Sequence, residues 1–275
     1  MERKEKDKKL LVKKYNFLIG VPRSGNTVIS SILNQNKKLA LTSNSPLSGL
    51  LYELDLLKRN TDNIGDIINN FPDIGSYSNI IRNIFVNYYS DWEQEYIFDR
   101  GVWGTPCHLE LLNRYFDFDF KFLILRRKLV DVFASWMKWC EENPNNFINK
   151  HTNFGDVDTK YEFLVTKRTS LIGKCMLSTY EVMNSNYFHH IIWYDDFVKD
   201  PQKEINLFYD AFGIERYDHN FNNIGQFKLN GVKYDDTSYG RNMHTVRSVV
   251  DKIEYDIERY VPSHIIKKLN DLDIP

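Results

Sequence analysis

The sequence lacks the cysteine patterns that mark metal-binding and disulfide-rich proteins. Its 275 residues include three cysteines, Cys107, Cys140 and Cys175. None of them forms a C-x-x-C pair or has a Cys/His spacing that suits a metal. An odd and scattered set of thiols is typical of reduced cysteines in a cytoplasm. We therefore expect a cytoplasmic protein with no metal site.

An excess of one charge and long apolar runs are also missing. Lysine and arginine total 36 against 37 aspartates and glutamates, a net charge of −1. Without a basic excess we expect no nucleic-acid partner. No stretch reaches the roughly 18 apolar residues of a membrane span. Residues 1–12 are of mixed charge and lack the apolar centre of a signal peptide, so we expect a flexible tail. With 42% hydrophobic residues, the chain is expected to form a single domain over residues 1–275.

A third absence is a lysine in a phosphate-binding loop. Residues 20–27 read Gly-Val-Pro-Arg-Ser-Gly-Asn-Thr, between an apolar run that suits a strand and a segment that suits a helix. Such a loop directs backbone N–H groups and a helix N-terminus toward an anion. The nucleoside triphosphate pattern G-x-x-x-x-G-K-[ST] has lysine where this chain has Asn26. Arg23 supplies a cation inside the loop instead. The loop predicts a phosphorylated nucleotide and argues against simple ATP or GTP hydrolysis.

A second anion-binding pattern follows a later strand. The apolar run 122–125 ends in Arg126 and Arg127 and leads directly into a helical pattern that contains Asp131 and Ser135. Open α/β sheets bind ligands at the carboxyl ends of their strands. We therefore expect Arg127 and Ser135 to grip one anion together.

These two motifs resemble those of the sulfotransferases that use 3′-phosphoadenosine 5′-phosphosulfate (PAPS). Residues 22–27 look like the family's 5′-phosphosulfate loop, P-[KR]-S-G-[TN]-T, and Arg127 with Ser135 looks like its 3′-phosphate clamp. A third match, residues 193–201, is similar to the segment Y-E-D-L-x-x-D-P, whose tyrosine, here Tyr194, packs by the adenine. The three matches follow the family's order across roughly residues 15–215.

The alternation of strands and helices predicts an α/β fold. We expect a three-layer sandwich with a central, mainly parallel sheet, and the phosphate-binding loop after the first strand. Expected strands are 15–20, 39–42, 95–99, 121–126 and 189–194. Expected helices are 27–36, 46–58, 77–90, 105–116, 128–142, 160–185, 201–212, 249–259 and 262–271. Residues 142–158 are predicted to be a polar loop and residues 215–248 a long loop.

The resemblance implies a role for each matched residue. The cofactor, PAPS or its product PAP, is expected to contact the phosphate loop, the clamp and the adenine-side tyrosine. It is also expected to contact two residues of the long loop 215–248, which we call the late loop. The expected contact residues are Arg23, Ser24, Gly25, Asn26, Thr27, Val28, Arg127, Ser135, Tyr194, His244 and Arg247. Arg23 and Arg100 are expected to be the catalytic cations that offset charge in the transition state.

The general base is less defined by the sequence. The tyrosylprotein branch of the family places a glutamate soon after the second strand, and the first carboxylate here is Glu53. Cytosolic members place a histidine two residues after the basic residue, where this chain has Val102. We take Glu53 as the catalytic candidate, with His108 and Asp99 as alternatives.

The sequence thus predicts a transferase that moves a sulfuryl group from PAPS to an acceptor hydroxyl or amine, without a metal. The acceptor, a sugar, peptide, lipid or small metabolite, is not encoded in any shared motif. Two alternatives stay open: a phosphate-loop nucleotide kinase, and an inactive family member that binds nucleotide only.

Overall fold

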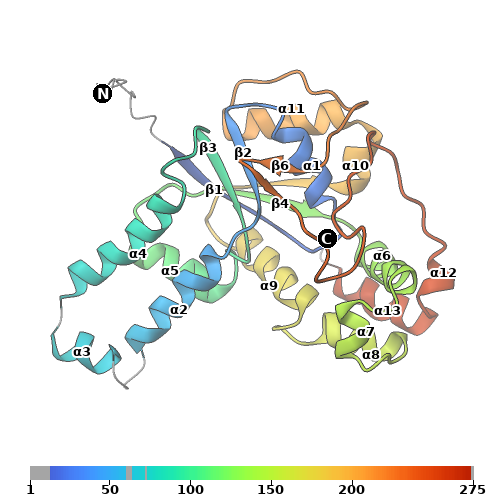
Figure 1. The fold of residues 1–275 in the computed structure, drawn as a ribbon, viewed down its shortest axis with the longest axis horizontal. Coiled ribbons are helices and arrows are strands. Elements are labelled where there is room, and N and C mark those ends of the chain that lie inside the picture. The colour runs from blue at the N-terminus through green and yellow to red at the C-terminus, as the bar shows by residue number, and fades with distance from the viewer. Residues whose placement is uncertain (1–12, 60–63, 72, 274–275) are drawn as a thin grey trace.

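The central element of the protein is a parallel β-sheet (Figure 1). The structure, a computed structural model, describes residues 13–59, 64–71 and 73–273, so the tail predicted over residues 1–12 lies outside it. Within these residues, five strands pair in the order β2-β3-β1-β4-β5, and every pair is parallel. The strands are β1 (Lys14–Gly20), β2 (Leu39–Asn44), β3 (Tyr96–Arg100), β4 (Phe122–Arg126) and β5 (His189–Trp193).

Helices cover both faces of the sheet, because both faces are apolar. Along β1, Phe17 and Ile19 point to one face and Leu18 to the other, and all three are buried. The first face packs against α2 (Leu47–Arg59), α4 (Ile74–Tyr88), α5 (Pro106–Tyr115) and α9 (Leu171–Met183). The second packs against α1 (Asn26–Leu33), α10 (Tyr194–Lys199) and α11 (Pro201–Phe212). The predicted α/β three-layer fold is confirmed.

A further group of helices packs beyond the carboxyl end of β4. Its centre is α6 (Leu129–Glu142), whose buried stripe includes Val132, Phe133 and Trp136. The Asp273 carboxylate accepts a hydrogen bond from the Leu129 N–H at 3.0 Å and so caps α6. The surrounding elements are α7 (Phe147–His151), α8 (Val157–Tyr161), a π-helical turn (Glu162–Thr166), α12 (Ile257–Tyr260) and α13 (Ser263–Leu272).

One predicted helix is broken in the structure. The prediction of a continuous helix over 160–185 is wrong, because α8 passes into the π-helical turn and α9 begins anew at Leu171. The break occurs where Ser170 accepts a hydrogen bond from the Gly173 N–H at 3.2 Å and becomes an N-cap. The loop prediction for 142–158 misses α7, which begins because the Asn146 side chain accepts from the Asn149 N–H at 2.9 Å.

The C-terminal third also differs from its prediction. Residues 215–248 are mostly irregular, as expected, but include the hairpin of β6 (Lys228–Leu229) and β7 (Val232–Lys233). The predicted helix 249–259 is reduced to α12. The apolar residues before α12 do not form the buried face of a helix. Val249, Val250 and Ile253 line a cavity instead. Helices α3 (Ile64–Asn70) and α10 were also missed. None of the described helices has the length and apolar character to span a bilayer.

The topology brings the predicted motifs to one edge of the sheet. The strand order places β1 in the middle, with β3 on one side and β4 on the other. In parallel sheets, ligands bind in the crevice at the carboxyl ends of the strands where the winding reverses. Here that crevice lies between the loop after β1 and the ends of β3 and β4.

Candidate functional site

The loop between β1 and α1 has the backbone geometry of an anion cradle. Gly20 (φ 148°), Arg23 (φ 73°) and Gly25 (φ 90°) all have positive φ. A Cβ on Gly20 would lie 2.4 Å from the Leu125 carbonyl oxygen, so only glycine fits beside β4. The first N–H groups of α1, beginning at Asn26, have no acceptor within the helix and are available to an anion.

Two side chains fasten this loop from inside. The Ser24 hydroxyl is fully buried and donates to the Val21 carbonyl oxygen at 2.7 Å. The Asn26 side-chain amide donates to the same oxygen at 3.0 Å and to the Ser24 hydroxyl at 3.2 Å. Asn26, where a triphosphate loop has lysine, therefore braces the loop through its side chain. Any contact of Ser24 or Asn26 with an anion would come from the backbone.

The Arg23 side chain links three segments across the site. Its Nε donates to the Ser135 hydroxyl at 3.0 Å, and its Nη1 donates to the Met243 carbonyl oxygen at 2.6 Å. The guanidinium also lies over the Trp136 ring, 5.8 Å from the centroid. Burial is the main cause that lowers the pKa of Arg23, and the nearby positive charge of Arg127 lowers it further. A half-buried cation of this kind is stabilised when an anion binds beside it.

Arg127 is the second cation of the site. It is 6% exposed, and its Nη1 donates to the Arg23 carbonyl oxygen at 3.1 Å. Its guanidinium lies 4.3 Å from the centroid of the Tyr194 ring and 5.2 Å from that of Tyr255. Its Nε is buried and makes no hydrogen bond within the described residues. Arg127 and Ser135 thus both contact Arg23 and line the same cavity, while Asp131 does not line it.

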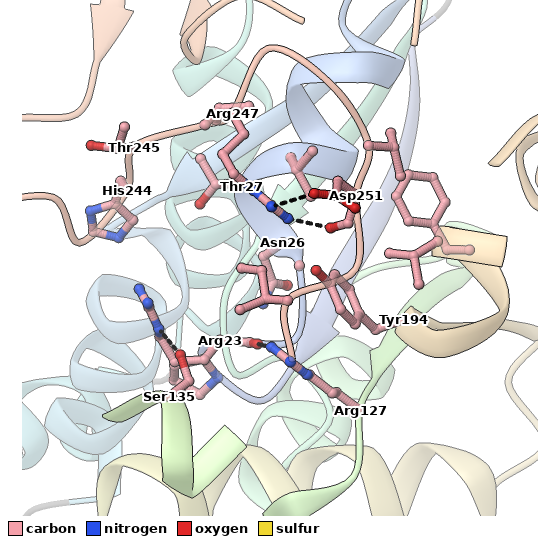
Figure 2. Close-up of a pocket in the computed structure, with 18 of the residues that line it drawn as sticks. Arg23, Asn26, Thr27, Arg127, Ser135, Tyr194, His244, Thr245, Arg247 and Asp251 are labelled. Carbon is pink, nitrogen blue, oxygen red and sulfur yellow. Dashed lines mark hydrogen bonds and ion pairs between the residues drawn. The ribbon is translucent and has the colours of Figure 1, made fainter. Parts of the chain in front are cut away.

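The late loop forms the opposite wall of the cavity (Figure 2). Arg247 pairs with Asp251: its Nη1 lies 3.2 Å from the carboxylate, and its Nη2 donates to the Asp251 carbonyl. Figure 2 shows this pair above Asn26, with His244 and Arg23 at one end of the cavity and Arg127 and Tyr194 at the other. Both late-loop residues predicted from the sequence therefore lie in the site.

Arg100 reaches the same cavity from the end of β3. Its Nη1 donates to the Tyr234 hydroxyl at 2.9 Å, and its backbone N–H donates to the Thr42 hydroxyl at 2.8 Å. The strand end and the late loop together fix this guanidinium. Arg23, Arg100, Arg127 and Arg247 now surround one cavity.

The three base candidates named from the sequence lie elsewhere. Glu53 is an exposed residue of α2 and does not line the cavity. Both ring nitrogens of His108 are engaged, Nδ1 with the Thr105 hydroxyl at 2.6 Å and Nε2 with the Ser48 carbonyl oxygen at 3.1 Å. Burial lowers the pKa of His108. His108 does not line the cavity either.

Asp99 is a structural carboxylate. It is the fully buried penultimate residue of β3 and accepts hydrogen bonds from Ser45 at 2.9 Å, from the Trp103 indole at 2.7 Å and from the Tyr89 hydroxyl. Burial raises the pKa of Asp99 to about 6, against the effect of these donors. With its oxygens occupied, Asp99 supports β3 and the position of Arg100.

The cavity encloses about 210 Å³ and collects nearly all the residues predicted from the sequence. Ser24 and Glu53 are outside its lining, as are the two alternative bases, His108 and Asp99. Several lining residues were missed, because they carry no motif and come from the irregular late segment or from α6. They include Trp136, Met243, Asp251, Ile253 and Tyr255. Among the described residues, no group of three or more His, Cys, Asp or Glu side chains is placed to hold a metal ion.

Comparison with known proteins identifies the fold. No protein-family model and no curated protein matches the sequence. Among solved structures, the chain is similar to the sulfotransferase domain from the curacin biosynthetic pathway, with 14% identity and a TM-score of 0.50, over 96% of this chain and 99% of that one. It is also similar to mouse sulfotransferase SULT7A1 complexed with PAP, with 14% identity and a TM-score of 0.54, over 94% of this chain and 82% of that one. The chain has the sulfotransferase fold.

The fold match extends over almost the whole chain. The resemblance inferred from three short motifs is therefore confirmed at the level of the fold. At 14% identity the likeness establishes the backbone arrangement. The chemistry depends on the residues of this chain.

Proposed function

We propose that this protein is a sulfotransferase that moves a sulfuryl group from PAPS to an acceptor hydroxyl or amine. The observation that carries the proposal is the convergence of four arginines, the α1 N-terminus and a tyrosine ring on one cavity. PAPS has a 5′-phosphosulfate and a 3′-phosphate, so its site must offset several negative charges on a single nucleotide. A mouse sulfotransferase with the same fold was solved with PAP.

The cavity residues suit such a nucleotide. Under this proposal, the backbone of residues 23–28 and the Thr27 hydroxyl hold the 5′ end. Arg127 and the Ser135 hydroxyl hold the 3′-phosphate, and the buried Arg127 Nε adds an unused donor nearby. The Tyr194 ring lies against the guanidinium of Arg127 and lines the cavity where an adenine would pack. Arg247 would exchange its bond to Asp251 for a phosphate.

Catalysis would rest on positioning and charge. Sulfuryl transfer resembles phosphoryl transfer: a group moves in line through a loose transition state, and negative charge grows on the leaving oxygen. Arg23 and Arg100 are fixed by hydrogen bonds before any ligand arrives, so they stabilise this charge with little reorganisation. The acceptor would be a sugar, peptide, lipid or small metabolite.

Thermal unfolding with a set of nucleotides tests the proposal. At about 100 times its Kd, PAP should stabilise the fold by about 2.7 kcal/mol. AMP and ATP at the same concentration should shift the melting temperature far less, because they lack a 3′-phosphate. Equal shifts with PAP, AMP and ATP would contradict the proposal. A shift that required ATP together with Mg²⁺ would favour the kinase alternative.

A further inference from the structure

A histidine–aspartate pair lies at one end of the cavity. The His244 Nδ1 lies 2.6 Å from the Asp236 Oδ1, and the His244 backbone N–H donates to the Asp236 Oδ2 at 2.9 Å. Both carboxylate oxygens are thus engaged by the same residue, which fixes the carboxylate in place. The carboxylate requires a proton on Nδ1, so the neutral ring has its lone pair on Nε2.

The ring is also held in its plane. His244 stacks on Tyr234 with a centroid distance of 3.9 Å and an interplanar angle of 5°. The Tyr234 hydroxyl accepts from Arg100, so the stack is tied to the end of β3. The His244 Nε2 makes no hydrogen bond with any described residue, and the side chain, 19% exposed, lines the cavity. A base is therefore positioned and its basic atom is unused.

The charges around His244 favour the neutral ring. Burial is the largest cause that lowers its pKa below the usual 6.5, and the Arg100 and Arg23 guanidiniums lower it further. The Asp236 carboxylate acts in the opposite direction and raises it. The net effect is a lowered pKa, so His244 is neutral at pH 7 and gains a proton only at lower pH. A phosphate contact, the role that the sequence suggested, would instead need the protonated ring.

We infer that His244 is the general base of transfer and that Asp236 positions it. The inference rests on the proposed function. The acceptor oxygen forms a bond to sulfur while the bond between sulfur and the 5′-phosphate oxygen breaks, which leaves PAP. The acceptor hydroxyl proton passes to the His244 Nε2 and then to solvent. Asp236 keeps its bond to Nδ1 and stabilises the imidazolium.

The key variant is His244→Asn, because its amide reproduces the Nδ1–H donor toward Asp236 but leaves no basic atom at the Nε2 position. The Kd for PAP should stay within about threefold of the wild-type value. The rate of PAP formation from PAPS, with water as the acceptor, should fall by about 10²–10⁴. The matched control is His264→Asn. His264 is in an exposed pair with Asp158, at 2.8 Å, outside the cavity, and its variant should match the wild type in both measurements.

Two further readouts do not depend on the size of the turnover. Nitrogen-15 NMR of the histidines, assigned by the loss of one signal in His244→Asn, should show a neutral His244 with its proton on Nδ1 at pH 7. Asp236→Asn should move the acid limb of the wild-type pH–rate profile to lower pH, because the carboxylate raises the pKa of His244.

The outcomes separate the two proposals. If the wild type does not bind PAP, the proposed function fails. If the wild type binds PAP and forms it from PAPS but His244→Asn does so equally fast, only the general base fails. A charged His244 at pH 7, or a tenfold loss of PAP affinity in His244→Asn with an unchanged rate, would restore the phosphate-binding role and overturn this inference.

Discussion

The Arg127 guanidinium donates a hydrogen bond to the carbonyl oxygen of Arg23 at 3.1 Å. The contact joins the end of β4 to the phosphate loop after β1, which are separated by more than a hundred positions in the sequence. It also places two guanidinium groups close together. Burial is the main cause that lowers the pKa of Arg23, and the charge of Arg127 lowers it further. The positive potential of these two side chains therefore favours binding of a polyanion at this site.

The first prediction concerns Arg127 and uses two nucleotides. Arg127→Ala should raise the Kd for PAP by about 30-fold or more, since the loss of one partner of a buried charge pair costs about 2–5 kcal/mol. The Kd for AMP should change by about threefold or less, because AMP has no 3′-phosphate. Isothermal titration calorimetry measures both. Arg259→Ala, which removes an exposed ion pair with Glu141, is the control. Equal losses of affinity for PAP and AMP would mean that Arg127 supports the conformation of the phosphate loop and does not bind the 3′-phosphate.

The second prediction separates strain from catalysis at Arg23. A non-glycine residue at φ 73° costs roughly 1 kcal/mol of folding stability. The free energy of unfolding of Arg23→Gly should therefore exceed that of Arg23→Ala by about 1 kcal/mol. Both variants lose the guanidinium, and both should lower kcat for PAPS by about 10²–10³ with a smaller change in PAP affinity. Urea unfolding and steady-state kinetics provide the two measurements.

The control for Arg23 is Thr27, which lies in α1. Thr27→Gly should be less stable than Thr27→Ala by about 1 kcal/mol, the reverse order, because glycine weakens an ordinary helical position. If Arg23→Ala equals or exceeds Arg23→Gly in stability, the left-handed conformation is not the source of strain. If Arg23 variants lose only affinity, the transition-state role is wrong.

Motifs that are continuous in the sequence could be predicted well. The phosphate loop, Arg127 and Tyr194 each come directly after a strand of the sheet, Ser135 lies on the helix that follows Arg127, and parallel pairing alone brings strand ends to one edge. The late loop could not be placed in this way. It is held by contacts between residues far apart in the sequence. For example, the Arg23 Nη1 donates to the Met243 carbonyl oxygen, 220 positions away. The sequence of residues 215–256 has no periodicity from which such contacts could be predicted.

The base shows the same limit. The family pattern predicts a base after the second or third strand, at Glu53 or His108. In the structure, the Nε2 of His108 is hydrogen-bonded to the Ser48 carbonyl oxygen, whereas the Nε2 of His244 makes no hydrogen bond with a described residue. The difference depends on Asp236 and on a stack with Tyr234, which a sequence of irregular polar residues does not reveal. Spacing predicts sites on regular elements much better than sites on loops.

The third prediction tests close packing at Gly25. A Cβ there would lie 2.7 Å from the Cδ2 of Tyr194, and φ is +90°. Gly25→Ala should therefore displace the Tyr194 ring, on which Arg127 lies, and weaken PAP binding by about tenfold, or about 1.4 kcal/mol. Gly213→Ala is the matched control, because Gly213 also has positive φ, +64°, but no atom lies within 4 Å of its added Cβ.

Both glycine variants should lose about 1–2 kcal/mol of folding stability from backbone strain. Only Gly25→Ala should also lose affinity, as measured by calorimetry with PAP. A Gly25→Ala protein that bound PAP as tightly as Gly213→Ala would show that the position of Tyr194 does not matter for the nucleotide.

The last prediction concerns Asp251, which competes with the nucleotide for Arg247. The Arg247 Nη1 lies 3.2 Å from the Asp251 carboxylate, and both residues line the cavity. Asp251→Asn removes a negative charge and weakens the pair, so Arg247 should become available to a phosphate. Because the two side chains are 44% and 65% exposed, the gain should be about 0.2–1 kcal/mol, or about a 1.4- to 5-fold lower Kd for PAP.

Glu254→Gln removes the same charge from the same segment outside the cavity and controls for net charge. The advantage of Asp251→Asn should shrink at high salt, which screens exposed pairs. If Asp251→Asn weakens PAP binding while Glu254→Gln does not, the aspartate holds the late loop in place for the nucleotide instead of competing with it.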